Sequence, residues 1–230
     1  MKLLAIETSG RRGSAALAEG TSAGIRPLAE VALPATPRTA QTLLPAIRQL
    51  LAEAGWQPGD LGGIAVTVGP GSFTGLRLGI VTAKTLAYAT GAALVGVPTL
   101  AALAIGRQAQ QRPVWAVLDA QRDEVFAARF LAEPNGDAAD AEVLVAPFDE
   151  FVAQLQPGEA VVTPAAAKFA DRWPGGVQLL PGVDDGPPAS AVAELGWQML
   201  QAGQTVDPLQ LVPRYHRRSA AEEKAVRSGS

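Results

Sequence analysis

The chain has 230 residues, of which 48% are apolar, so it can bury a sizeable core as one large or two small domains. It has no cysteine and a single histidine, His216, which excludes disulfide frameworks and thiol chemistry and argues against metal sites and histidine-based catalysis. The net charge of −3 argues against a standalone nucleic-acid binder. Because no apolar run reaches membrane-spanning length and the N-terminal run is too short for a signal sequence, we expect a cytoplasmic protein with no membrane contact.

Residues 1–110 show three predicted strands followed by alternating helices and strands. Strands are predicted at 3–6, 14–18 and 28–33, then a helix at 36–54, a strand at 64–68, a helix at 75–90, a strand at 93–97 and a helix beginning at Pro98. The order βββαβαβα is typical of a ribonuclease-H-like fold. We therefore predict an α/β lobe of that type.

Residues 111–207 repeat the same order in a reduced form that is richer in proline and glycine. Strands are predicted at 114–118, 124–131 and 142–145, then a helix at 147–155, a strand at 160–163, a short helix at 165–171, a strand at 177–180 and a helix at 189–202. The order of elements predicts a duplicated fold with a second, smaller lobe. Residues 208–230 are expected to form a polar, basic, partly disordered tail, or alternatively a basic patch that helps a complex to hold RNA.

The stretch from residue 64 to residue 90 is the centre of the first lobe. Glycines and a proline at 69–71 end the strand, and Ser72 or Thr74 is predicted to cap the following helix. A glycine-rich turn between a strand and a helix can bind phosphate, but Leu76 and Thr74 replace the residues that a Walker loop or a dinucleotide fingerprint requires. The alternative is a tight turn that leads into a packed helix.

The helix at 75–90 is apolar on two sides and carries only two charged residues, Arg77 and Lys84. Small residues recur at every fourth position, which places them on one face: Gly75, Gly79, Ala83 and Ala87. Such a face lets another backbone come close, and two apolar sides imply two packing partners. One partner is the sheet of the same lobe, and the second is either an internal helix or another protein.

Two such lobes resemble the actin-like ATPase and sugar-kinase superfamily, and several motifs narrow the resemblance. They are Ile6-Glu7-Thr8-Ser9, Leu43-Leu44-Pro45, the run Gly69-Pro-Gly-Ser-Phe-Thr-Gly-Leu-Arg77, Val95-Gly96-Val97 and the hairpin Asp119-Ala-Gln-Arg-Asp-Glu-Val-Phe126. These motifs are similar to those of the bacterial TsaB (YeaZ) family. The similarity covers the whole chain but is dense only over residues 1–125.

The resemblance implies a non-catalytic subunit in the formation of the N6-threonylcarbamoyl group on adenosine 37 of tRNAs that read codons beginning with A. Such a subunit binds and activates the TsaD transferase, a paralogue of the same fold, together with the ATPase TsaE. It meets tRNA through that complex, and alone it forms a homodimer through similar surfaces.

In the family, the helices at 36–54 and 75–90 build the contact with TsaD. The interface residues expected on that basis are Leu43, Ile47, Leu76, Arg77, Gly79, Ile80, Ala83 and Ala87. For Arg77, a solvated charge in the first turn is the alternative. The resemblance also implies a vestigial nucleotide cleft lined by Glu7, Thr8, Ser9, Gly71, Ser72 and Asp119.

We expect no catalytic residue, metal or cofactor, while weak or partner-dependent nucleotide binding stays open. The catalytic paralogue carries a pair of metal-binding histidines where Thr99 and Leu103 stand here. The alternative function is an ATP-dependent small-molecule phosphotransferase of the sugar-kinase type, with Glu7 at its centre. Against it, the hairpin after Asp119 has no glycine beside the phosphates, and residues 162–165 lack the adenosine-binding glycines. A peptidase site cannot be assembled from these residues.

Overall fold

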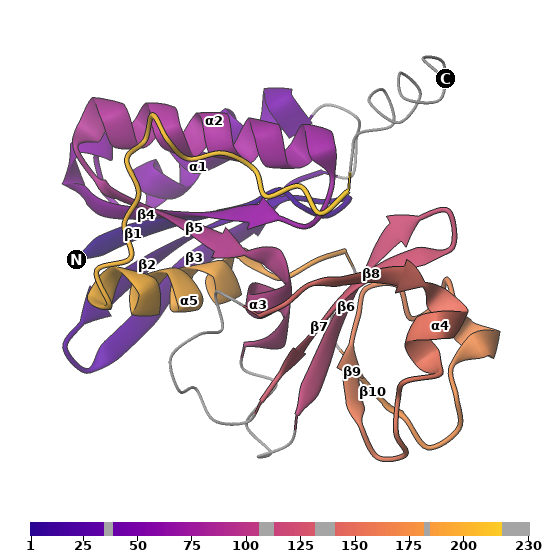
Figure 1. The fold of residues 1–230 in the computed structure, drawn as a ribbon. Helices are drawn as coiled ribbons and strands as arrows, with labels where there is room; N and C mark the ends of the chain where they lie inside the picture. Colours follow the sequence, from indigo (N-terminus) through magenta and orange to yellow (C-terminus); the bar gives the residue numbers. More distant parts are fainter. Residues whose placement is uncertain (35–38, 106–112, 132–140, 182–184, 218–230) are drawn as a thin grey trace.

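The computed structural model describes residues 1–34, 39–105, 113–131, 141–181 and 185–217, which form two lobes, each built on one five-stranded sheet (Figure 1). The first sheet contains β1 (Lys2–Glu7), β2 (Ser14–Thr21), β3 (Gly24–Ala32), β4 (Leu61–Gly69) and β5 (Ala93–Pro98) in the order β3-β2-β1-β4-β5. The first three strands form an antiparallel meander, and β4 and β5 run parallel to β1.

The second sheet has the same topology. It contains β6 (Val114–Gln121), β7 (Glu124–Phe130), β8 (Leu144–Pro147), β9 (Ala160–Val162) and β10 (Gln178–Leu180) in the order β8-β7-β6-β9-β10. Again the first three strands are antiparallel and the last two are parallel to the central strand. The predicted duplication of a ribonuclease-H-like lobe, with a reduced second copy, is confirmed.

Two long helices, α1 (Thr39–Glu53) and α2 (Phe73–Thr90), cover one face of the first sheet (Figure 1). On the central strand β1, Leu4 and Ile6 point into this layer, while Leu3 and Ala5 point to the opposite face. Alternate residues of a strand face opposite sides, so a strand that is apolar at every position needs cover on both sides. The sheet therefore lies between two layers of helices.

The opposite face of the first sheet is covered by α5 (Ala189–Gln201) and bordered by α3 (Thr99–Ala104), which also packs against β6 and β7. The prediction that the helix at 189–202 belongs to the second lobe is wrong, because α5 contacts all five strands of the first sheet. Small side chains on this face of the sheet, among them Ala5 and Ala65, let the helix come so close that a Cβ at Gly196 would clash with Ala65. The helix after the second lobe thus completes the first.

The second lobe is reduced, as expected, and its helices are shorter than predicted. Its outer face is covered by α4 (Phe148–Val152) and by an aromatic cluster in which Phe148 stacks on Phe169 with ring centroids 3.9 Å apart. The short helix predicted at 165–171 is wrong: turns occupy the segment, followed by a 3-10 helix at Ala170–Arg172. A second 3-10 helix, Pro58–Asp60, precedes β4. Among the described residues, no helix is long and apolar enough to span a membrane.

The segment that follows α5 packs against the first lobe, so residues 208–217 are not the free tail that the sequence predicts; residues 218–230 lie outside the described ranges. We call residues 206–217 the strap. It returns along the first lobe beside α2 and then reaches the junction of the lobes (Figure 1). Its Leu211 is buried in the core beneath α2, and the backbone N–H of Arg214 donates to the carbonyl of Val68 at 2.7 Å. The strap therefore behaves as part of the fold.

Candidate functional site

A cleft of about 770 Å³ lies between the two lobes, where the superfamily resemblance places nucleotides. The first lobe lines it with the turn after β1 and the turn before α2, and the second lobe with the end of β6 and with Lys168. Of the six predicted cleft residues, five line this space: Thr8, Ser9, Gly71, Ser72 and Asp119. Glu7 lies beneath them.

The glycine-rich turn packs tightly against the turn after β1. The backbone N–H of Ser72 donates to the carbonyl of Ser9 at 2.7 Å, and a Cβ on Gly71 would lie 2.6 Å from that carbonyl. The hydroxyl of Ser72 accepts from the N–H of Gly75 at 3.2 Å, so the predicted cap is confirmed for Ser72. A Cβ on Gly75 would clash with the carbonyl of Thr8. Close packing thus explains these glycines without a phosphate.

The carboxyl group of Glu7 is buried behind the residues that line the cleft. It accepts hydrogen bonds from the backbone N–H of Ser9, at 2.7 Å, and from the Ser9 hydroxyl. Burial raises the pKa of Glu7 to about 7, although the bonds from Ser9 act in the opposite direction. Burial thus favours the protonated form of this carboxyl group, and its hydrogen bonds to Ser9 compete with coordination of a magnesium ion.

Asp119 is held within the second lobe. It accepts from Lys168 at 2.6 Å and from the backbone N–H of Gln121 at 2.8 Å. The turn that follows has positive φ angles at Gln121, Arg122 and Asp123, although none of them is glycine. The side chains at these positions limit how closely the backbone can approach a phosphate. The hairpin differs from a phosphate-binding loop in the way the sequence predicts.

The expected partner residues lie mostly inside the protein. Seven of the eight are buried in the chain's own core: Leu43, Ile47, Leu76, Gly79, Ile80, Ala83 and Ala87. A Cβ on Gly79 would clash with the hydroxyl of Thr8, so the small-residue face of α2 packs against the chain's own sheet and the turn after β1. The inference that this face awaits another protein is therefore corrected, because its neighbour is internal.

The outer side of the same helices carries different apolar residues. Leu44 on α1 and Val81 and Tyr88 on α2 are 53, 59 and 77% exposed. Val81 and Tyr88 are seven residues apart and so share one side of the helix, and α1 lies next to α2 (Figure 1). The sequence prediction missed these residues because it placed the interface on the small residues of α2 and not on the large side chains of the opposite face.

Arg77 is the one exposed residue of the expected set. Its guanidinium lies 3.8 Å from the centroid of the Phe73 ring, and its Nε donates to the hydroxyl of Tyr215 at 2.9 Å. The Phe73 and Tyr215 rings stack with centroids 4.7 Å apart. Arg77 thus joins the start of α2 to the strap. Its contact with a partner stays a prediction.

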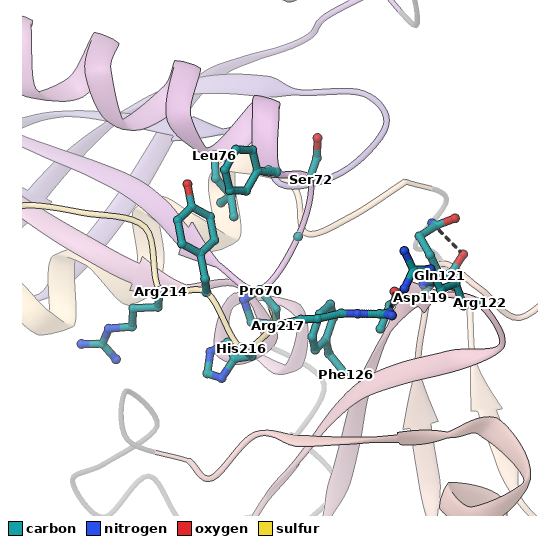
Figure 2. A pocket seen from close by; sticks show the side chains of 14 residues that line it. Pro70, Ser72, Leu76, Asp119, Gln121, Arg122, Phe126, Arg214, His216 and Arg217 are labelled. Atoms are coloured by element: carbon teal, nitrogen blue, oxygen red, sulfur yellow. Dashed lines mark hydrogen bonds between the residues drawn. The ribbon is translucent and has the colours of Figure 1, made fainter. Parts of the chain in front are cut away.

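The strap then passes into the junction between the lobes. Figure 2 shows His216 and Arg217 between Pro70 of the first lobe and the β6–β7 hairpin of the second. Together with Arg214 and Leu76 they line a pocket of about 270 Å³. Arg217 donates to the carbonyl of Ala120 at 3.0 Å and pairs with Glu124 at 2.7 Å. Sequence analysis missed these contacts because the strap has no periodic pattern that would place it.

The resemblance places the paralogue's histidine pair at Thr99 and Leu103, which are both in α3. Thr99 is buried at the start of the helix and Leu103 is buried in the core shared by both lobes. The backbone here is therefore part of the packing between the lobes. These two side chains offer a hydroxyl and a hydrocarbon, neither of which can replace an imidazole ligand.

Comparisons with known proteins agree with this architecture. Residues 33–171 match the family model described as TsaD: tRNA N6-adenosine threonylcarbamoyltransferase. Two solved structures from Pseudomonas aeruginosa are similar over nearly all of both chains: one described as YeaZ and one as an uncharacterized protein with similarity to peptidase YEAZ. They are 27 and 28% identical, with TM-scores of 0.76 and 0.77, and cover 93 and 94% of this chain and 99% of their own.

The repeated sheets and the cleft between them define a two-lobed protein of the ribonuclease-H-like type. The Escherichia coli protein named tRNA threonylcarbamoyladenosine biosynthesis protein TsaB is 31% identical over 195 residues, which cover 80% of this chain and 83% of the relative. The chain belongs to the TsaB (YeaZ) family. A tRNA N6-adenosine threonylcarbamoyltransferase from a Ruegeria species is 47% identical to this chain, but over only 66 residues, which are 29% of this chain and 18% of that protein.

Proposed function

We propose that this chain is a subunit of the machinery that forms the N6-threonylcarbamoyl group on adenosine 37 of tRNA. In this role it binds and activates a transferase of the TsaD family, in a complex that also includes the ATPase TsaE. The complex as a whole binds the tRNA. The names of the relatives support the pathway: the relatives from Escherichia coli and Bacillus subtilis are both described as threonylcarbamoyladenosine biosynthesis proteins.

The proposed role is that of a non-catalytic subunit. This proposal is supported by the residues that stand where an active member of the superfamily would carry its metal-binding or phosphate-binding groups. Thr99 and Leu103 are packed into the core where the paralogue carries its histidines, Glu7 is buried, and Asp119 is paired with Lys168. A reaction at this cleft would first have to break those contacts. We assign the chemistry to the partner.

The observation that carries the binding role is the apolar outer face of α1 and α2. Large apolar residues exposed on neighbouring helices mark an interaction surface when they gather in one patch. Leu44, Val81 and Tyr88 are exposed on two helices that contact each other, while the inner faces of both helices are already occupied by the sheet. We place the contact with the transferase on this outer face. Self-association of the free chain would use the same residues.

Reconstitution of the reaction tests this proposal. The transferase of the same organism is incubated with threonylcarbamoyl donor and unmodified tRNA, with and without this chain, and the modified nucleoside is quantified. We expect modification to depend on the chain, and we expect Val81→Asp to remove most of the stimulation while Leu179→Asp, an exposed position on β10, retains it. Full activity without the chain would contradict the proposal.

For the cleft, we propose that nucleotide binds weakly or only when the partner is present. Glu7 is buried, and the two acidic residues that line the cleft are each in an ion pair: Asp119 with Lys168 and Asp185 with Arg12. A magnesium-bound phosphate would have to compete with these contacts. Calorimetry of the isolated chain with ATP and Mg²⁺ distinguishes this from the phosphotransferase alternative. Micromolar binding by the isolated chain would favour the phosphotransferase.

A further inference from the structure

The strap lies beside α2 and extends the layer of helices. Within this layer α1 packs over β2 and β3, and α2 packs over β4. The strap follows next to them: the N–H of Val206 donates to the carbonyl of Leu94 on β5 at 2.9 Å, and Lys84 of α2 donates to the carbonyl of Leu211 at 3.0 Å. These contacts fix the strap as the third element of the layer.

The strap is anchored by one side chain and presents others outward. Leu211 is buried, whereas its neighbours Leu209 and Val212 are 75 and 64% exposed. Ten large apolar residues are exposed in the described part of the chain, and six of them lie on α1, α2 and the strap: Leu44, Val81, Tyr88, Leu209, Val212 and Tyr215. The exposed apolar surface of α2 therefore continues onto the strap.

We propose that the strap is the third element of the surface that binds the TsaD-family transferase, with Leu209 and Val212 in direct contact with it. This inference rests on the proposed function and extends its binding surface beyond the two helices. An apolar patch rimmed by polar residues is the usual anatomy of a protein–protein interface. The strap lies outside residues 33–171, which are the residues that match the family model.

The charges around the surface favour a different protein over a second copy of this chain. On α1, α2 and the strap, the basic residues are Arg48, Arg77, Lys84, Arg214 and Arg217, and the acidic ones are Glu53 and Asp207. Two copies paired through this face would bring two surfaces with an excess of positive charge together, at an electrostatic cost. A partner with an acidic rim would be attracted instead. We therefore assign the face to the transferase and expect that rim to be acidic.

The test compares four purified variants in calorimetric titrations with the transferase. Val212→Asp examines the strap, Val81→Asp examines α2, and Leu179→Asp is the control on the second lobe. Val212→Ser repeats the strap test with a smaller change. Equal thermal midpoints show that each variant is folded. We expect Val212→Asp to raise the Kd at least tenfold, which is about 1.4 kcal/mol, and Leu179→Asp to leave it within twofold.

The possible outcomes distinguish a failure of this inference from a failure of the proposed function. If Val81→Asp weakens binding and neither Val212 variant does, the strap is not part of the surface, while the proposed function stands. If the unmodified chain does not bind the transferase at all, the proposed function fails. If the Val212 variants only dissociate a homodimer of the free chain and leave the transferase Kd unchanged, the strap contacts a second copy and the inference is wrong.

Discussion

Packing of α2 against the turn after β1 leads to a quantitative prediction for Gly79→Ala. A Cβ at this position would clash with the hydroxyl of Thr8 and lie 3.4 Å from the Thr8 Cβ. Thr8 is buried and β-branched, which restricts the side-chain rotation that could relieve this clash. Overpacking of this kind costs about 1–3 kcal/mol, whereas alanine gains about 1 kcal/mol over glycine within a helix.

We therefore expect Gly79→Ala to lower the free energy of unfolding by up to about 2 kcal/mol in the native background, from the difference between those two terms. In a Thr8→Ala background the clashing hydroxyl is gone, so the same substitution should be neutral or stabilise by up to about 1 kcal/mol. Urea unfolding of the four proteins, with equal m-values, measures the coupling between the two sites.

The control is Thr85→Ala on the exposed side of α2, which should stabilise slightly in both backgrounds and show no coupling with position 8. If the effects of Gly79→Ala and Thr8→Ala add to within about 0.5 kcal/mol, the two residues do not pack together. The account of the small-residue face as internal core would then be refuted.

Two further predictions concern stability. The Glu7 pKa of about 7 in the folded protein, against an ordinary 4.5, means that folding favours the protonated acid. The contribution of Glu7 to stability is therefore full at acid pH and is lost as the pH rises from about 4.5 to 7, by up to about 3 kcal/mol. Glu7→Gln should remove this pH dependence of the free energy of unfolding. Equal pH profiles for the two proteins would contradict the prediction. Leu211→Ala should cost about 2–3 kcal/mol in chemical unfolding because Leu211 is buried, whereas Val212→Ala, at the exposed neighbouring position, should stay within about 0.5 kcal/mol. Similar costs at both positions would show that the strap is not anchored as described.

Local patterns predicted the fold well. The spacing of apolar residues and glycines predicted every strand of both sheets, and Ser72, one of the two predicted caps, precedes α2. Contacts between elements that are distant in the sequence could not be predicted from these local patterns. The pattern of α5 shows an apolar face but does not say which of two similar sheets it covers, and small residues on that face of the first sheet decide the choice.

The same limit applies to the candidate site. Periodicity placed Gly79 and Ala83 on one face of α2, but it could not tell whether that face pointed inward or outward. The close approach of Thr8 makes it the inner face, and the outward residues Val81 and Tyr88 form the opposite stripe. The strap carries no periodic signal, because one buried leucine and scattered backbone hydrogen bonds hold it in place.

The central claim is that this chain acts by binding a TsaD-family transferase through the outer face of α1, α2 and the strap. Size-exclusion chromatography with light scattering, on the chain mixed with the transferase of the same organism, tests it most directly. The account predicts a complex with the combined mass of one copy of each, which Val81→Asp abolishes and Leu179→Asp preserves. Two separate peaks at micromolar concentrations, or a complex indifferent to Val81→Asp, would contradict it.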